Sequence, residues 1–333
     1  MFPLHSPITN KQKRTMKKFS LITTLIAPLI LLSGCEKEKV TDEADAVKIQ
    51  FSAEDTSSRA AIGSEGFPKG SAFSVWGYMT KEFQTATVFD GSTVTKEADD
   101  NWNCNDIRYW FPGWTYNFYG VYPVNASNNV SVSQSGEIKI ENFDCSATGA
   151  DAKDLMTGAT IGCSYTIGTE PKSVSITFSH LLAKVDFVGK CQGGNASVSS
   201  IKIDNIYTLG TYTSSSETTP WTLSQNTNSI SISHEQPVAL NTEGLSVSGD
   251  LLIIPQTLTN TNIILTVTYN TETETDKTAI YNLPVDVITE WAAGKSYSYS
   301  FTVTGGGYIV FDPPTVNNWN NAIGGDVNID VTQ

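Results

Sequence analysis

A short alternating pattern, Val47-Lys48-Ile49-Gln50-Phe51-Ser52, sets the class of this protein. Apolar residues stand at every second position, and successive side chains of a strand point to opposite faces of a sheet. The pattern therefore predicts a strand with one buried face, carried by Val47, Ile49 and Phe51. The residues on either side of this strand add information on export and on domain organisation.

Upstream, the sequence has the three parts of a secretory signal: a basic head (residues 11–18), the apolar run Phe19–Leu32, and the small residues Ser33 and Gly34. The apolar run has 14 residues, whereas a membrane-spanning helix needs about 20. Residues 1–34 are therefore interpreted as a signal peptide. The small residues before Cys35 resemble a bacterial lipobox, which implies that Cys35 carries a lipid and that residues 35–46 form a flexible tether. The alternative is an ordinary signal peptide followed by an incidental cysteine.

Composition predicts an all-β protein that does not bind nucleic acid. Charged residues make up 17% of the 333 residues, and the formal net charge is −13, whereas nucleic-acid phosphates require clustered Lys and Arg. Short alternating stretches recur between turns about every ten residues, which is typical of β-sandwiches. The length favours two domains, and a turn-rich stretch at residues 168–172 places them at 47–170 and 171–333.

No catalytic, metal or cofactor motif is present. The histidines are His5, His180 and His234, and His180 lies beside an apolar segment, which favours a structural role. The sequence has no nucleophile elbow, no His-Glu-x-x-His, no Walker loop and no Gly-x-Gly-x-x-Gly. The acidic residues Asp99-Asp100 and Asp151 with Asp154 are interpreted as solvated loop residues. The protein is therefore not expected to be an enzyme, and a secreted hydrolase is disfavoured because its residues are missing.

Four cysteines remain beside Cys35, namely Cys104, Cys145, Cys163 and Cys191. An exported chain meets an oxidising compartment, so one or two disulfides are one outcome and buried free thiols are the other. Four cysteines allow three pairings, and the sequence does not select among them.

The aromatic stretch from Trp102 to Tyr122 has two interpretations. Aromatic side chains supply the largest burial free energies, so a place in the core is favoured. The alternative is a sugar-binding platform, which would make the protein a surface glycan-binding lipoprotein. Nearby, Asp90-Gly91 predicts the turn of a hairpin within Phe83–Val94. The apolar run His180–Val188 suits either a short helix or a strand.

The end of the chain repeats the opening pattern. Behind Gly324-Gly325, the apolar residues Val327, Ile329 and Val331 alternate with polar residues. A one-sided strand must bury its apolar face, either in its own sheet or in a groove of another molecule. The paired glycines widen the accessible φ range and provide a hinge.

Landmarks along nearly the whole mature chain resemble the fimbrillin family, the subunits of type V pili. No single landmark is specific for the family, but their order along the chain is specific for it. They are the lipobox at Cys35, Ile49-Gln50-Phe51-Ser52 with Ser58-Arg59-Ala60, Phe118-Tyr119 to Tyr122-Pro123, Phe178 to Val185, Leu252-Ile253-Ile254-Pro255-Gln256, and Trp291-Ala292-Ala293-Gly294-Lys295 with Tyr297 and Tyr299.

This resemblance implies two tandem transthyretin-like β-sandwich domains, seven-stranded and of Greek-key type, and export as a lipoprotein to the outer membrane and then the fimbrium. It implies that a trypsin-like surface protease cuts after an arginine and removes the first strand. A strand donated by a neighbouring pilus subunit then fills the groove. The implied role is cell adhesion. The position as stalk, tip or anchor subunit, and the surface receptor, stay open.

Mapped onto this chain, the resemblance places the cleavage between Arg59 and Ala60. Val47, Ile49 and Phe51 belong to the displaced strand, and Val327, Ile329 and Val331 to the donor strand. The alternatives are that Arg59 is a solvated loop residue and that the terminal strand is an edge strand of its own domain.

Overall fold

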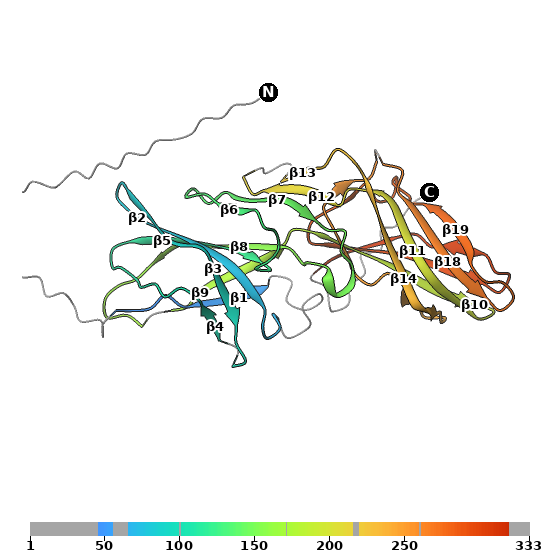
Figure 1. Ribbon diagram of the computed structural model, residues 1–333, viewed down its shortest axis with the longest axis horizontal. Coiled ribbons are helices and arrows are strands. Elements are labelled where there is room, and N and C mark those ends of the chain that lie inside the picture. Colours follow the sequence, from blue (N-terminus) through green and yellow to red (C-terminus); the bar gives the residue numbers. More distant parts are fainter. Residues whose placement is uncertain are drawn as a thin grey trace, which may run out of the picture. The chain divides into compact units, whose positions relative to one another are not determined.

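The computed structural model describes residues 46–55, 66–99, 101–170, 172–215, 220–259 and 261–319 (Figure 1). Within these ranges the secondary structure is β throughout, apart from one 3-10 turn, η2 (Gly149–Asp151). The all-β prediction is confirmed. The described ranges hold no helix with the length and apolar character required to cross a membrane.

The first half of the chain forms a closed barrel with the strand order β1-β4-β3-β2-β5-β8-β9. Its strands are β1 (Phe51–Asp55), β2 (Ala72–Lys81), β3 (Gln84–Lys96), β4 (Trp102–Cys104), β5 (Thr115–Tyr122), β8 (Met156–Ser164) and β9 (Val174–His180). A second sheet has the order β13-β12-β7-β6. It comprises β6 (Val130–Val132), β7 (Ile138–Asp144), β12 (Leu209–Thr213) and β13 (Trp221–Leu223).

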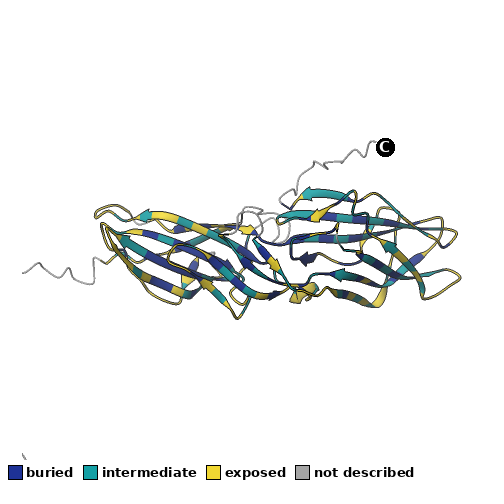
Figure 2. Ribbon diagram, turned by 90° about the horizontal axis from the view of Figure 1, so that it is seen from above, coloured by how far each residue is buried: buried dark blue, intermediate teal, exposed yellow. Residues whose placement is uncertain are grey.

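Strands β2 and β5 are buried on both faces, which explains why the aromatic stretch does not alternate. On β5, Tyr116 and Phe118 point into the barrel, whereas Tyr119 and Val121 pack outside it in a cluster with the second sheet. Figure 2 shows the resulting runs of buried residues in the strands. Gly120 allows the ring of Phe178 to approach, because a Cβ there would lie 2.7 Å from the ring.

The interpretation of the aromatic stretch as core holds for five of its nine aromatic residues, whereas Tyr109 and Phe111 are exposed. The side chains of five of its rings are at most 9% exposed, namely Trp102, Trp110, Tyr116, Phe118 and Tyr119. These rings cannot stack on a sugar in solvent.

The second half of the chain packs two further sheets around one core. The six-stranded sheet comprises β10 (Ala183–Gln192), β15 (Leu245–Ser246), β16 (Leu251–Ile253), β21 (Lys295–Thr304), β22 (Ile309–Phe311) and β23 (Thr315–Asn318). The four-stranded sheet has the order β14-β11-β18-β19. Its strands are β11 (Ala196–Ile206), β14 (Asn228–Ala239), β18 (Ile264–Thr271) and β19 (Lys277–Asn282). A small pair joins β17 (Gln256–Thr257) to β20 (Glu290–Trp291).

Strand pairing crosses the expected boundary between residues 170 and 171. Strand β9 pairs with β1 and β8 and so completes the barrel, and β12 pairs with β7. The chain passes from β9 to β10 through Leu181 and Leu182 alone. The run His180–Val188 is therefore strand on both sides of this two-residue link, with His180 in β9 and Ala183–Val188 in β10.

The predicted hairpin turn at Asp90-Gly91 is wrong. Strand β3 runs through both residues, and the register against β2 shifts between Val75 and Trp76. Gly91, with φ +72°, forms a bulge there. The actual turn lies at Glu82 and Phe83, where Glu82 takes φ +55°. The Asp-Gly pair correctly indicated a glycine with positive φ, but that glycine forms a bulge and not a hairpin turn.

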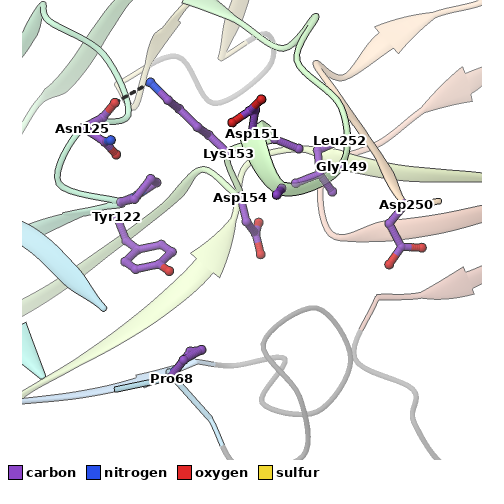
Figure 3. Close-up of a pocket in the computed structure, with 12 residues that line it drawn as sticks. Pro68, Tyr122, Asn125, Gly149, Asp151, Lys153, Asp154, Asp250 and Leu252 are labelled. Atoms are coloured by element: carbon purple, nitrogen blue, oxygen red, sulfur yellow. Dashed lines mark hydrogen bonds between the residues drawn. The ribbon is translucent and has the colours of Figure 1, made fainter. Parts of the chain in front are cut away.

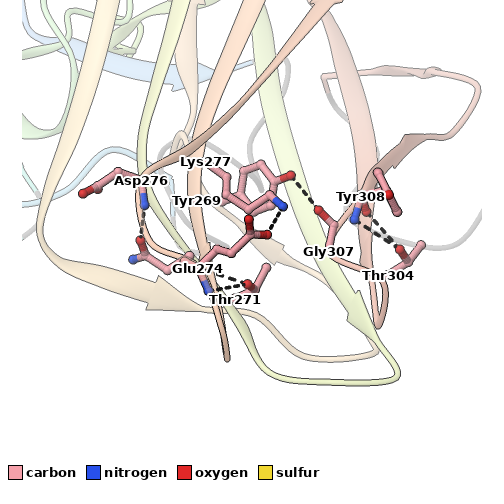
Figure 4. Close-up of polar contacts among 9 residues, drawn as sticks. Tyr269, Thr271, Glu274, Asp276, Lys277, Thr304, Gly307 and Tyr308 are labelled. Atoms are coloured by element: carbon pink, nitrogen blue, oxygen red, sulfur yellow. Dashed lines mark hydrogen bonds and ion pairs between the residues drawn. The ribbon is translucent and has the colours of Figure 1, made fainter.

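Backbone and side-chain hydrogen bonds hold the turn between β21 and β22 (Figure 4). Tyr269 donates its hydroxyl to Gly307 O at 2.9 Å, and the Gly307 N–H donates to Thr304 O at 2.8 Å. Lys277 and Glu274 form an ion pair beside this turn. The glycines Gly305 to Gly307, which follow β21, therefore form a hydrogen-bonded turn.

Cys104, Cys145, Cys163 and Cys191 are free thiols. Cys145 is 6% exposed, and burial raises the pKa of its thiol to about 12. Burial also raises the pKa of Cys104 and Cys163, which are half-buried. The structure agrees with the free-thiol alternative.

We expect Cys145 to resist alkylation in the folded protein. With a pKa of about 12, roughly one Cys145 thiol in ten thousand is ionised at pH 8, and only the thiolate reacts. Iodoacetamide labelling followed by mass spectrometry should modify Cys104 and Cys163 first, and Cys145 only when urea unfolds the chain. Rapid labelling of Cys145 at pH 8 without urea would contradict its burial.

Candidate functional site

The first segment, which we define as residues 46–55, closes the barrel. Its leading part pairs with residues 108–110: the Ile49 N–H donates to Arg108 O at 2.8 Å, and the Trp110 N–H donates to Val47 O at 2.9 Å. Strand β1 then pairs in parallel with β9 at five positions, from Phe51 to Asp55. On its other side, β1 meets β4 at one position, Phe51 opposite Trp102. The predicted first strand is thus part of a sheet, three to four residues later than its pattern suggested.

Alternate residues of the first segment point into the barrel core. Ile49 is 1% exposed and Phe51 is 3% exposed, and Val47 packs against the same core while half-buried. Lys48 and Gln50, between them, are exposed. The three residues assigned to the displaced strand therefore share the inward face, as the period of two requires.

Phe51 lies at the centre of an aromatic cluster. Its ring centroid is 5.4 Å from that of Phe89, 5.6 Å from that of Phe118 and 6.4 Å from that of Phe73, all in edge-to-face geometry. Edge-to-face pairs stabilise by about 0.5–1.5 kcal/mol each beyond the burial of their area. The segment is therefore held by core packing as well as by backbone hydrogen bonds.

Removing the first segment would leave β9 and the extended residues 108–110 without a partner on one side. The N–H and C=O groups that face it on β9 and on residues 108–110 would lose their bonds, including the one from the Val174 N–H to Gln50 O at 2.7 Å. Unpaired backbone groups next to an apolar row form a template for another extended chain. This arrangement can exchange one strand for another and offers no reactive group.

Several predicted residues lie outside the described ranges. They are Cys35, Arg59, Ala60, Val327, Ile329 and Val331. The structure does describe both flanks of the cleavage candidate, since β1 ends at Asp55 and the next described residue is Gly66. Arg59 therefore belongs to the connection between β1 and β2.

The described chain ends at a buried tryptophan that sequence reasoning did not single out. Trp319 is 1% exposed, its backbone N–H donates to Gly294 O at 2.9 Å, and the centre of its ring lies 3.9 Å from that of His180 in a stacked arrangement. The signal available was a lone aromatic residue within the polar run Asn317-Asn318-Trp319-Asn320-Asn321. Trp319 is therefore the last anchored residue before residues 320–333 of the sequence.

His180 has a structural role. Its ring nitrogen Nδ1 lies 2.7 Å from Asp154 Oδ1, and its side chain is 1% exposed. No substrate in solvent could reach a ring that is covered by Trp319. In the described ranges, no three His, Cys, Asp or Glu side chains gather in a way that could hold a metal ion.

A cavity of about 530 Å³ lies beside Asp154, the residue that contacts His180. Its lining also includes Tyr122, Asn125, Asp151 and Lys153 (Figure 3). Lys153 donates to Asn125 O at 2.6 Å, so its ammonium group is engaged within the wall. The lining mixes acidic, amide and apolar groups without a pattern that selects one ligand class. The interface of the first segment is therefore the stronger candidate site.

Comparisons with known proteins agree with this architecture. A family model described as fimbrillin-like matches residues 58–319. The structure of a "putative cell adhesion protein" from Bacteroides uniformis ATCC 8492 aligns with a TM-score of 0.57 at 18% identity, over 83% of this chain and 99% of that chain. Another "putative cell adhesion protein", from Bacteroides ovatus ATCC 8483, gives 0.53 at 13% identity, over 82% and 97%. These two likenesses show a shared fold.

A further solved structure, a "fimbrial protein" from Bacteroides vulgatus ATCC 8482, aligns with a TM-score of 0.45 at 16% identity, over 82% of this chain and 99% of that chain. No curated protein matches the chain in sequence.

We expect Phe51→Ala to lower the free energy of unfolding by about 3–5 kcal/mol, because it leaves a cavity among three phenylalanine rings. Ser52→Ala is the matched control, since Ser52 is half-buried on the opposite face of β1, and it should cost less than about 1 kcal/mol. Urea unfolding followed by tryptophan fluorescence measures both. Equal losses in the two variants would show that Phe51 does not anchor the segment.

Proposed function

The chain belongs to the fimbrillin-like family, whose members are structural and adhesion proteins of the cell surface and are not known as enzymes, and on that premise we propose how it assembles. It is exported as a lipoprotein, loses its first segment by cleavage after Arg59, and polymerises into a pilus by donor-strand exchange. The observation that carries the proposal is the placement of Ile49 and Phe51. Both side chains fill the barrel core. The covalent link from the first segment to β2 is the connection that contains Arg59, so one cut there separates the segment from the rest of the barrel.

Arginine is scarce in the mature chain, which supports Arg59 as the cleavage site. Beyond Cys35, the sequence contains two arginines, Arg59 and Arg108. Arg108 is fixed: its Nε–H donates to Val88 O at 2.9 Å, and its guanidinium carbon lies 6.0 Å from the centre of the Phe89 ring. Proteases require an extended, accessible stretch of chain. An arginine-specific protease would therefore be directed to Arg59.

The spacing and length of the tail suit it as the donor. Val327, Ile329 and Val331 repeat the spacing of Val47, Ile49 and Phe51. The tail after Trp319 has 14 residues, against 10 in the first segment; at about 3.3 Å per residue these span roughly 46 Å and 33 Å. The tail of one copy is long enough to occupy the place of the first segment in another.

The proposed partners and location follow from this scheme. Other pilus subunits supply and receive donor strands, and a trypsin-like surface protease makes the cut. The lipid on Cys35 holds the uncut subunit at the outer membrane. The proposal retains two tandem transthyretin-like sandwiches, with β9, β12 and β13 added to the sandwich formed by residues 47–170. The glycan-binding alternative is disfavoured because Trp110 is only 8% exposed and Trp114 is half-buried, although Tyr109 and Phe111 of the same stretch are exposed.

We expect cleavage at Arg59 to trigger assembly. The mature chain treated with an arginine-specific protease should form ladders on a gel, and Arg59→Ala should form none. Arg59→Lys is the control: it should assemble after trypsin but stay monomeric after the arginine-specific protease, because the cut and not the side chain is required. Ladders from Arg59→Ala would show that cleavage there is not the trigger.

We expect Ile329→Asp in the tail to weaken assembly at least about 100-fold, because an unpaired carboxylate in an apolar site costs several kcal/mol. Asn328→Asp is the control, since residue 328 would point away from the core and adds the same charge. Sedimentation of the trimmed variants over a concentration series measures the effect. Assembly of Ile329→Asp at the wild-type concentration would exclude Ile329 as an anchor.

A further inference from the structure

Three loops meet at the end of the barrel where the first segment begins. Across β2, β5 and β8 the residues Thr80, Thr115 and Ser164 lie in one row. The β2–β3 turn, the loop that precedes β5 and the loop that follows β8 are therefore neighbours (Figure 1). Because β1 and β9 are parallel and Phe51 pairs with Val174, the first segment starts at this same end.

Exposed apolar side chains gather on these loops. Phe83 is 103% exposed, Ile167 is 77%, Phe111 is 54% and Tyr109 is 43%. We call these four residues the tip patch. Tyr109 also forms the bridge to Lys48, so the patch adjoins the path of the first segment. Single exposed apolar residues are normal, but a group of them at one end indicates an interaction surface.

We propose that the tip patch is the docking surface for the body of a second copy of this chain, next to the start of that copy's tail. This inference rests on donor-strand exchange as proposed above. A donor that keeps the register of the first segment places Val327–Val331 at the positions of Val47–Phe51. Its preceding residues then leave the barrel at the tip patch.

Chain length brings the second copy close. Between Trp319, which is buried in its own subunit, and Val327 there are seven residues. Fully extended, they reach roughly 23 Å at about 3.3 Å per residue. The body of the donor subunit must therefore lie against or near the tip of the acceptor, and apolar contact there adds to the strand exchange.

Charge disfavours a membrane as the occupant. Lys81 and Lys172 lie at the same end of the barrel as the acidic residues Glu82 and Glu170, and Lys48 adds one basic residue there only while the first segment is present. An anionic lipid surface attracts clusters of basic residues, whereas this end of the barrel carries basic and acidic residues side by side.

The test compares whole subunits with an isolated tail. The triple variant Phe83→Ser, Phe111→Ser and Ile167→Ser, trimmed after Arg59, should need at least about tenfold higher concentration for half-assembly than trimmed wild type. A synthetic peptide of residues 320–333 should bind trimmed wild type and trimmed triple variant equally, because it brings no subunit body to the tip. Leu209→Ser, a change on β12 at a residue that is 39% exposed, is the control and should assemble as wild type does.

Each other outcome overturns the assignment. If the triple variant assembles like wild type while the peptide binds, the tip patch is not an interface although donor-strand exchange stands. If Leu209→Ser weakens assembly equally, the effect is not specific to the tip. If the patch substitutions abolish flotation of the untrimmed chain with phosphatidylglycerol vesicles but leave assembly unchanged, the occupant is a membrane. If trimmed wild type neither assembles nor binds the peptide, the proposed function fails, and the tip interface fails with it.

Discussion

The aromatic contact of Phe51 with the barrel is the constraint on which the rest depends. One side chain, delivered by a short parallel strand, completes a cluster with Phe73, Phe89 and Phe118. One backbone pair joins this strand to β4 and five join it to β9, and packing of the side chains adds to this attachment. A strand that is held by backbone bonds together with alternate side chains in pockets can be replaced by another strand with the same period, because backbone bonds do not depend on sequence.

The two-sided burial of β2 and β5 makes such a replacement tolerable. These strands pack against the barrel interior on one face and against the sheet of β6, β7, β12 and β13 on the other. Much of the apolar surface of the first half is thereby buried without the first segment. The proposed strand exchange requires a framework of this kind, in which much of the core does not depend on the first strand.

Sequence reasoning succeeded where the signal was local and failed where the partner was distant. The alternation Val47, Ile49, Phe51 identified the inward face correctly. The dense aromatic stretch identified core for most of its rings, but not for Tyr109 and Phe111, which are exposed. The Asp90-Gly91 pair was assigned to a hairpin, although it forms a bulge, because both structures use a glycine with positive φ. The expected boundary at 170/171 missed that β9 returns to pair with β1, since parallel pairing at such separation leaves no local pattern.

The sequence by itself determined the β class, the period of the first strand, and the matching period of the tail. These features depend on the alternation of side chains along an extended chain, which any strand shows regardless of its neighbours. Only the tertiary structure decided that Phe51 meets three rings from β2, β3 and β5, that Trp319 caps His180, and that Phe83, Phe111 and Ile167 share one end of the barrel. Those contacts join residues far apart in the chain, and their positions follow from strand order and register, which packing of the whole molecule selects.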